Sequence, residues 1–305
     1  MRFSRTPFLV KALFLCVVVL PLVAPLNFVL IQPGESTPLF PKVLKVNAAQ
    51  QSTYPVNGQL YLLSIYVTNP DAKVMGYQVL QCWAQAECVV MPRTVMYQDD
   101  TDTKNEIKKG KAQMKKSQSN ALAATKKLFA TKYPEINLSA LSDQSLEVSI
   151  KNTGGPSGGL IFALGITDLF TSTDLLQGRK VAASGTISAS GKVGPIGGIS
   201  EKIIAAKKSG ATLLFAAREN CDELRTHVSG ITVVAVDQLS DAVTYLEKPY
   251  LGRVQGMDKK SGASSSSHPV IGCTNLGIWI EIEHRYRSEE HTSELQSPMY
   301  LVCRL

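Results

Sequence analysis

The segment GGPSGG, which starts at Gly154, places Ser157 between glycines and directly before an apolar stretch with helical spacing. Pro156 suits the first turn of a helix, and the glycines allow the backbone to turn tightly. We therefore expect Ser157 at a helix N-terminus, where unpaired backbone N–H groups can stabilise an oxyanion as a serine attacks a carbonyl group. The structural alternative is that the Ser157 hydroxyl only caps the helix.

A serine nucleophile needs a base, for which the sequence offers His227 and Lys202. His227 lies in RTHVSG, at the end of a predicted helix, and nothing in the sequence directs it towards Ser157. Lys202 follows the glycine-rich turn of VGPIGGISEK and lies in the first turn of a predicted helix. Burial and the positive end of the helix dipole would both favour its neutral form. Lys202 is therefore the better candidate, although an ordinary ion pair with Glu201 also fits the spacing.

Strand and helix patterns alternate around these residues. The strand patterns SLEVSI, VAASGTIS, ATLLFAA and ITVVAV alternate with helical patterns after Pro156, from Ser200, near Asp222 and from Gln238. This alternation predicts an α/β domain over residues 144–248. With 44% hydrophobic and 19% charged residues, the 305-residue chain is globular in composition.

Residues 35–143 are expected to form a small β-rich and helical region. A hairpin-like unit is predicted over Val43 to Val67, with Asn57-Gly58 as its turn, and VVMPRTVMY is a further extended segment. Apolar residues seven apart predict a helix from Thr103 to Tyr133. Its lysines are typical of a solvated helix face rather than of a surface for anionic lipid or nucleic acid, because no aromatic residues lie between them. We expect no nucleic-acid partner.

Residues 1–34 are predicted to be an N-terminal membrane anchor. No charged residue occurs from Ala12 to Gln32, and that length is close to the roughly 20 residues that cross a bilayer as a helix. A cleaved signal peptide with Ala24 at its cleavage site is the alternative. Because Arg2 and Arg5 would stay in the cytoplasm, the anchor predicts a single-pass protein of the cell membrane with its main domain outside the cytoplasm.

The C-terminal residues 249–305 do not continue the preceding pattern. Residues 287–305 begin with RSEEHTSELQSP, which resembles a translated sequencing adapter, and we exclude them from inferences about the fold.

Upstream, Cys82 and Cys88 flank WAQAE, and both a local disulfide and two free thiols fit this spacing, whereas a metal site is disfavoured. Cys221 has no evident partner.

Residues from about Ser145 to Lys248 resemble the proteolytic domain of the Lon protease family. GGPSGG is similar to its serine motif GPSAG, and VGPIGGISEK is similar to its lysine motif, PIGG followed by EK. The resemblance implies that Ser157 is the nucleophile and Lys202 the general base. It also implies that the Ser184 hydroxyl orients the lysine. The backbone of Gly155, Pro156, Gly158 and Gly159 is expected to surround the oxyanion.

The chain departs from the Lon pattern at several points. Gly158 stands where the motif usually has alanine. No phosphate-binding loop is evident in the sequence, so we expect activity that does not depend on ATP. The predicted anchor and β-rich region resemble the membrane-anchored, PDZ-containing Lon-like proteases of bacteria. However, only the short segment from Tyr133 to Gln144 stands where the PDZ domain would be expected.

Together these features predict an ATP-independent serine endopeptidase that cleaves unfolded or flexible polypeptides at the membrane. We expect no metal or other cofactor, and the resemblance implies a homo-oligomeric ring. One alternative is an inactive Lon-like module that binds peptides without cutting them. Another is a nucleotide-binding α/β protein whose glycine-rich turns hold phosphate.

Overall fold

The computed structural model describes residues 7–46, 53–85, 87–98, 101–150, 153–224, 227–250 and 267–273, which belong to one compact unit ending at Cys273. Its longer helices are α1 (Phe8–Val23), α2 (Gly76–Ala84), α4 (Thr103–Lys132), α5 (Gly159–Phe170), α6 (Ile199–Lys208) and α7 (Leu239–Glu247). Short helical segments are η1 (Leu39–Val43), α3 (Arg93–Met96), η2 (Asp143–Ser145) and η3 (Arg218–Glu223).

A six-stranded mixed sheet forms the centre of this unit. Its strands, in spatial order, are β13 (Thr232–Val236), β11 (Leu213–Ala217), β8 (Lys180–Ser184), β4 (Gln59–Val67), β2 (Phe28–Pro38) and β6 (Val89–Pro92). The four strands from β13 to β4 are parallel, whereas β2 and β6 are antiparallel to their neighbours. All five residues of β11 are buried, which explains its continuous apolar sequence.

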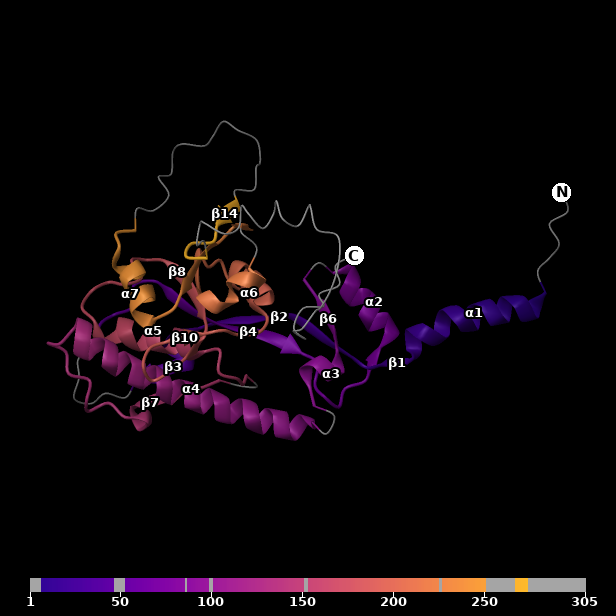
Figure 1. Ribbon diagram of the computed structural model, residues 1–305, viewed down its shortest axis with the longest axis horizontal. Coiled ribbons are helices and arrows are strands. Elements are labelled where there is room, and N and C mark those ends of the chain that lie inside the picture. The colour runs from indigo at the N-terminus through magenta and orange to yellow at the C-terminus, as the bar shows by residue number, and fades with distance from the viewer. Residues whose placement is uncertain are drawn as a thin grey trace, which may run out of the picture. The chain divides into compact units, whose positions relative to one another are not determined.

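Helices cover both faces of the sheet (Figure 1). On one face, α4, α5 and α7 pack against side chains such as Leu62 and Phe215. On the other face, α6 packs against the alternate side chains, including Leu63 and Leu214. Because successive side chains of a strand point to opposite faces, one strand can contribute to both layers. Mixed α/β architecture is therefore confirmed.

The strand partners differ from those predicted. β4 confirms the predicted QLYLLSIYV strand, but it pairs with β2 and β8 and not with the residues of the predicted hairpin partner between Val43 and Asn57. Those residues include β3 (Leu44–Val46), which pairs with β7 (Leu146–Val148). The predicted hairpin is thus wrong, because long-range pairing with buried strands takes the place of a local turn. The sheet also joins strands from both sides of residue 143, so that boundary does not separate two folding units.

Three further pairings between described strands are short. β1 (Pro25–Leu26) pairs with β5 (Val74–Met75), and β9 (Thr186–Ile187) pairs with β10 (Val193–Gly194). β12 (His227–Ser229) pairs with β14 (Ser267–Pro269). Near Asp222 the structure has the 3₁₀ segment η3 where a longer helix was predicted.

The N-terminal apolar segment does not form one continuous helix. α1 ends at Val23 and contains Pro21, and the chain then enters β1 and β2. The residues from Phe28 to Gln32, predicted as part of the anchor, belong instead to the central sheet, where Val29 and Ile31 are buried. In the described ranges, no helix combines the length and apolar character needed to span a membrane.

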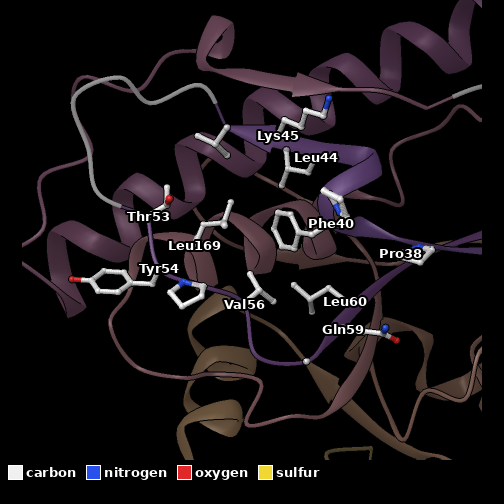
Figure 2. A pocket seen from close by; sticks show the side chains of 14 residues that line it. Pro38, Phe40, Leu44, Lys45, Thr53, Tyr54, Val56, Gln59, Leu60 and Leu169 are labelled. Carbon is white, nitrogen blue, oxygen red and sulfur yellow. The ribbon is translucent and has the colours of Figure 1, made fainter.

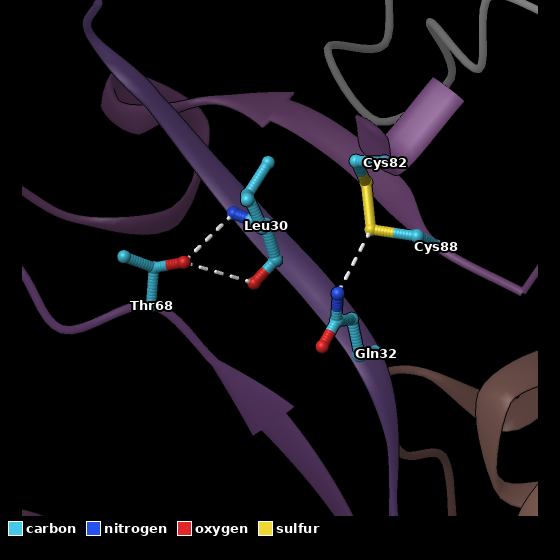
Figure 3. Close-up of a disulfide and its surroundings, with 5 residues drawn as sticks. All are labelled: Leu30, Gln32, Thr68, Cys82 and Cys88. Carbon is cyan, nitrogen blue, oxygen red and sulfur yellow. Dashed lines mark hydrogen bonds between the residues drawn. A yellow bond between two sulfur atoms is a disulfide. The ribbon is translucent and has the colours of Figure 1, made fainter. Parts of the chain in front are cut away.

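Two disulfides fix segments at the border of the sheet. Cys82 in α2 is bonded to Cys88 just before β6, and the Gln32 side chain of β2 contacts Cys88 Sγ (Figure 3). Cys221, expected to be unpaired, is bonded to Cys273. Residues 267–273 therefore pack on the fold, with Val270 buried, although the sequence from residue 249 does not continue the preceding pattern. The adapter-like residues 287–305 lie outside the described residues.

Candidate active site

Ser157 lies in the turn that leads into α5. The helix N-cap is Gly158, and no side chain donates or accepts a capping hydrogen bond there, so the structure does not support the reading of Ser157 as a helix cap. Gly155 has a φ of 95°, a conformation that favours glycine and makes the tight turn before Pro156. The Gly185 N–H donates to the Ser157 carbonyl oxygen at 3.0 Å, and the Leu160 N–H donates to the Gly185 carbonyl oxygen at 3.1 Å. These bonds hold the turn against the carboxyl end of β8.

Ser184, the last residue of β8, brings Lys202 to this turn. Lys202 Nζ donates a hydrogen bond to Ser184 Oγ at 3.1 Å, and Ser184 Oγ donates to the Ser157 carbonyl oxygen at 3.4 Å. Lys202 and Ser184 are 3% and 1% exposed. The Lys202 amine, the Ser184 hydroxyl and the Ser157 carbonyl group therefore lie together where β8 ends, between the first turns of α5 and α6.

Burial lowers the pKa of Lys202 to about 8, from 10.5, and the neighbouring Glu201 partly opposes this change. Among the described residues, Lys202 forms no ion pair with Glu201. Burial also raises the pKa of Glu201, which is 6% exposed. The first turn of α6 thus holds an amine that can become neutral near physiological pH, as a general base requires.

Some backbone N–H groups of the serine turn already donate hydrogen bonds, whereas others are available to a ligand. The Gly155 N–H donates to the Gly110 carbonyl oxygen at 2.9 Å, and the Gly159 N–H donates to the Pro156 carbonyl oxygen at 3.3 Å. Pro156 itself has no N–H. Gly155, Pro156 and Gly159 therefore offer no free N–H in this structure, and their place around an oxyanion stays a prediction. Within the described chain, the N–H groups of Ser157 and Gly158 have no acceptor.

Helix α4 also contributes to the turn, a contact that was not predicted. Gly110 supplies the carbonyl oxygen noted above, and Ser117 Oγ donates to the Pro156 carbonyl oxygen at 3.0 Å. A signal was present in the sequence, because these two small residues lie seven apart on the apolar face of the predicted helix. The alternative base His227 lies in β12, outside the central sheet.

A cavity formed by described residues lies elsewhere in the fold. Its volume is about 560 Å³, and its wall includes Phe40, Leu44, Val56, Leu60 and Leu169 (Figure 2). Neither Ser157, Ser184 nor Lys202 lines it. This cavity is therefore separate from the serine turn.

Comparison with known proteins places this site in a recognised domain. Residues 108–246 match the family model of the Lon protease C-terminal proteolytic domain. The chain is 30% identical over 195 residues to the mitochondrial Lon protease homolog of Caenorhabditis briggsae, a match that covers 61% of this chain and 20% of the relative. It is 36% identical over 89 residues to Lon protease 2 of Bacillus subtilis, covering 29% of this chain and 16% of the relative.

A third relative, the Lon protease of Campylobacter concisus, is 33% identical over 94 residues, which are 29% of this chain and 11% of the relative. The chain thus spans a fifth or less of the length of these relatives. The family match starts inside α4 and ends in α7, so it contains the serine turn, Ser184 and Lys202. Residues 108–246 are therefore similar to the Lon protease C-terminal proteolytic domain, a similarity that supports a serine-type peptidase.

Proposed function

We propose that the protein hydrolyses peptide bonds with Ser157 as nucleophile and Lys202 as general base. The observation that carries this proposal is the hydrogen bond between the buried Lys202 amine and Ser184 at the serine turn. A lysine can serve as a base only when it is neutral, and burial favours the neutral form. The match to a Lon-type proteolytic domain supports the same assignment.

In the proposed mechanism, neutral Lys202 accepts the proton of Ser157 Oγ as this oxygen attacks the substrate carbonyl carbon. The N–H groups of Ser157 and Gly158 stabilise the tetrahedral oxyanion. The Lys202 ammonium then gives its proton to the leaving amine, and the peptide C–N bond breaks to leave an acyl-enzyme. In the second half of the reaction, Lys202 accepts a proton from a water molecule as this water attacks the ester of the acyl-enzyme. Ser157 Oγ leaves, recovering its proton from Lys202.

We also propose that the reaction is independent of ATP and acts on unfolded or flexible polypeptides. No phosphate-binding loop occurs in the sequence, so nothing in this chain is suited to drive unfolding of a stable substrate. Assembly into a homo-oligomeric ring, which the resemblance implies, is a further part of this proposal. It is tested by measuring the mass of the purified protein in solution by light scattering.

Attachment to a membrane through α1 is the remaining part of the proposal, with the proteolytic domain on the extracytoplasmic side. Support comes from the exposed apolar side chains of α1, among which Phe8 is 82%, Leu13 67% and Phe14 71% exposed. A helix that is apolar on all sides is normally buried in protein or in lipid. Flotation with lipid vesicles tests this part, since replacing Leu13 and Phe14 by glutamate should leave the protein in the unbound fraction.

Cleavage of fluorescent casein by the full chain tests the proteolytic proposal. We expect activity without ATP, and loss of at least 10³-fold in Ser157→Ala and in Lys202→Ala. Ser190→Ala and Lys192→Ala are matched controls, because both residues are exposed and make contacts away from the serine turn. A folded, inactive parent protein that still binds casein would instead support a peptide-binding module.

A further inference from the structure

Helix α4 packs its backbone directly against the serine turn. The Gly155 N–H donates to the Gly110 carbonyl oxygen at 2.9 Å. A Cβ atom on Gly154 would lie 2.9 Å from the Gly110 carbonyl carbon, so only glycine permits this approach at residue 154. The backbone of α4 therefore fixes the peptide group two residues before Ser157.

A second contact from the same helix face reaches the next part of the turn. Ser117 is 3% exposed, and its Oγ donates to the Pro156 carbonyl oxygen at 3.0 Å. That carbonyl oxygen also accepts the Gly159 N–H at 3.3 Å. Since a carbonyl oxygen has two lone pairs, these two donors satisfy it, and the Pro156 carbonyl is held in one direction.

The direction of this carbonyl determines the direction of the Ser157 N–H. Both groups belong to the same planar peptide unit, and in a trans peptide the C=O and N–H bonds point in opposite directions. The Pro156–Ser157 peptide is not among the cis bonds of the described chain. Because the Pro156 carbonyl points towards α4, the Ser157 N–H points away from α4.

We propose that Ser117 is a positioning residue for the oxyanion site. Its hydroxyl orients the Pro156–Ser157 peptide, and this orientation aims the Ser157 N–H at the substrate oxyanion. The inference rests on the proposed proteolytic function. Ser117 does not touch substrate, so it acts only through this peptide group.

The place of α4 does not depend on Ser117 alone. The Asn120 side chain donates to the Ile187 carbonyl oxygen in β9 at 2.9 Å, and buried residues of α4 such as Ala121 and Leu128 lie in the main core. Removing the Ser117 hydroxyl should therefore release the peptide group without displacing the helix. A substitution of Ser117 therefore tests the role of its hydroxyl rather than the position of α4.

The test compares Ser117→Ala with Ser119→Ala in the full chain. Ser119 lies on the same helix, but its hydroxyl donates to Asp143 and not to the serine turn. We expect Ser117→Ala to lower kcat about 10-fold with little change in KM, a smaller loss than the 10²- to 10³-fold typical when an oxyanion donor is removed. Ser117→Thr keeps a hydroxyl and should recover most of kcat, while Ser119→Ala should match the parent protein.

Inhibition by a peptide aldehyde distinguishes a positioning role of Ser117 from general damage to the folded protein. The aldehyde forms a hemiacetal with a nucleophilic serine and places an oxyanion-like oxygen at the donors. Its inhibition constant should rise about 10-fold in Ser117→Ala, in parallel with kcat, and the pH midpoint of activity should not move. Equal kcat and equal inhibition in Ser117→Ala and Ser119→Ala would overturn the inference.

Amide hydrogen exchange over residues 154–159 supplies a readout that needs no activity. Loss of the Ser117 hydrogen bond should accelerate exchange of the Gly155 and Gly159 N–H groups relative to Ser119→Ala. If the parent protein is inactive, proteolysis is refuted, and exchange alone decides whether Ser117 orients the turn. Unchanged exchange in that case overturns the inference as well.

Discussion

Lys202 Nζ donates a hydrogen bond to Ser184 Oγ at 3.1 Å, while Ser184 Oγ donates its own proton to the Ser157 carbonyl oxygen at 3.4 Å. Because the single hydroxyl proton of Ser184 is directed to that carbonyl, its lone pairs face the lysine. A neutral amine that donates one N–H to Ser184 keeps its own lone pair available. In the mechanism that we propose, Lys202 can therefore accept the Ser157 proton while it keeps its contact with Ser184.

Activity should rise with pH through a midpoint near 8. Burial lowers the pKa of Lys202 to about 8, and only the neutral amine acts as a base, so the active fraction increases as pH rises through this value. The dependence of kcat/KM on pH between 6 and 10 measures the midpoint. A midpoint close to 10.4, the value of free lysine, would show that Lys202 is solvated or is not the base.

Ser184→Ala should reduce kcat about 10- to 100-fold and move the pH midpoint below 8. The hydroxyl accepts a hydrogen bond from the lysine, and its loss leaves the buried ammonium form without this partner. Ser184→Thr retains the hydroxyl and serves as the control. An unchanged midpoint in a folded Ser184→Ala protein would contradict an electrostatic role for this contact.

Asp168→Asn should stabilise the protein at pH 8 by about 1–2 kcal/mol and have little effect near pH 4. Burial, together with the nearby Asp174, raises the pKa of Asp168 to about 7, and its Oδ2 has no hydrogen-bond partner among the described residues. The folded state thus binds this proton more tightly than the unfolded state. Stability contributed by the protonated form below pH 4 is therefore lost as pH rises towards 7.

Urea unfolding at pH 5 and pH 8 measures this effect of Asp168. Asp222→Asn is a suitable control, because Asp222 is exposed. If Asp168→Asn and the parent protein show the same change in unfolding free energy between the two pH values, the carboxyl does not titrate on folding as expected.

Gly158→Ala should be tolerated, with kcat within about 3-fold of the parent and stability within about 1 kcal/mol. The added Cβ would lie 2.9 Å from the Phe162 ring edge and 3.1 Å from a Leu62 methyl group, both of which can move. Gly159→Ala should instead be strongly destabilising, since its Cβ would lie 2.9 Å from the Ile187 backbone nitrogen. Thermal unfolding and casein cleavage compare the two variants, and equal loss in both would refute this distinction.

Much of the candidate site followed from local sequence. The glycine-rich turns and the apolar spacing after Ser157 and around Lys202 predicted α5 and α6, and both helices are confirmed. The helix from Thr103 was predicted for the same reason, and α4 ends one residue earlier than expected. These elements are visible in sequence because capping, backbone turns and helical periodicity involve residues close in the chain.

Strand pairing was harder to predict from the sequence than the positions of the helices. The predicted strands β4, β8, β11 and β13 exist, but no local pattern selects β8 as the parallel neighbour of β4. Each apolar strand can bury its side chains against several partners. The partner is therefore chosen by the packing of the whole sheet, which joins residues far apart in the chain.

By itself, the sequence determined the residue types and spacing of Ser157, Ser184 and Lys202, and the two motifs that resemble a Lon-type proteolytic domain. Only the tertiary structure decided which N–H groups are available beside Ser157, that α4 holds the serine turn, and that the chain after Val23 enters the sheet. The physical reason is that hydrogen-bond satisfaction and burial depend on neighbours from distant parts of the chain. The lowered pKa of Lys202 likewise depends on its burial by residues outside the lysine motif, so the motif alone could not predict it.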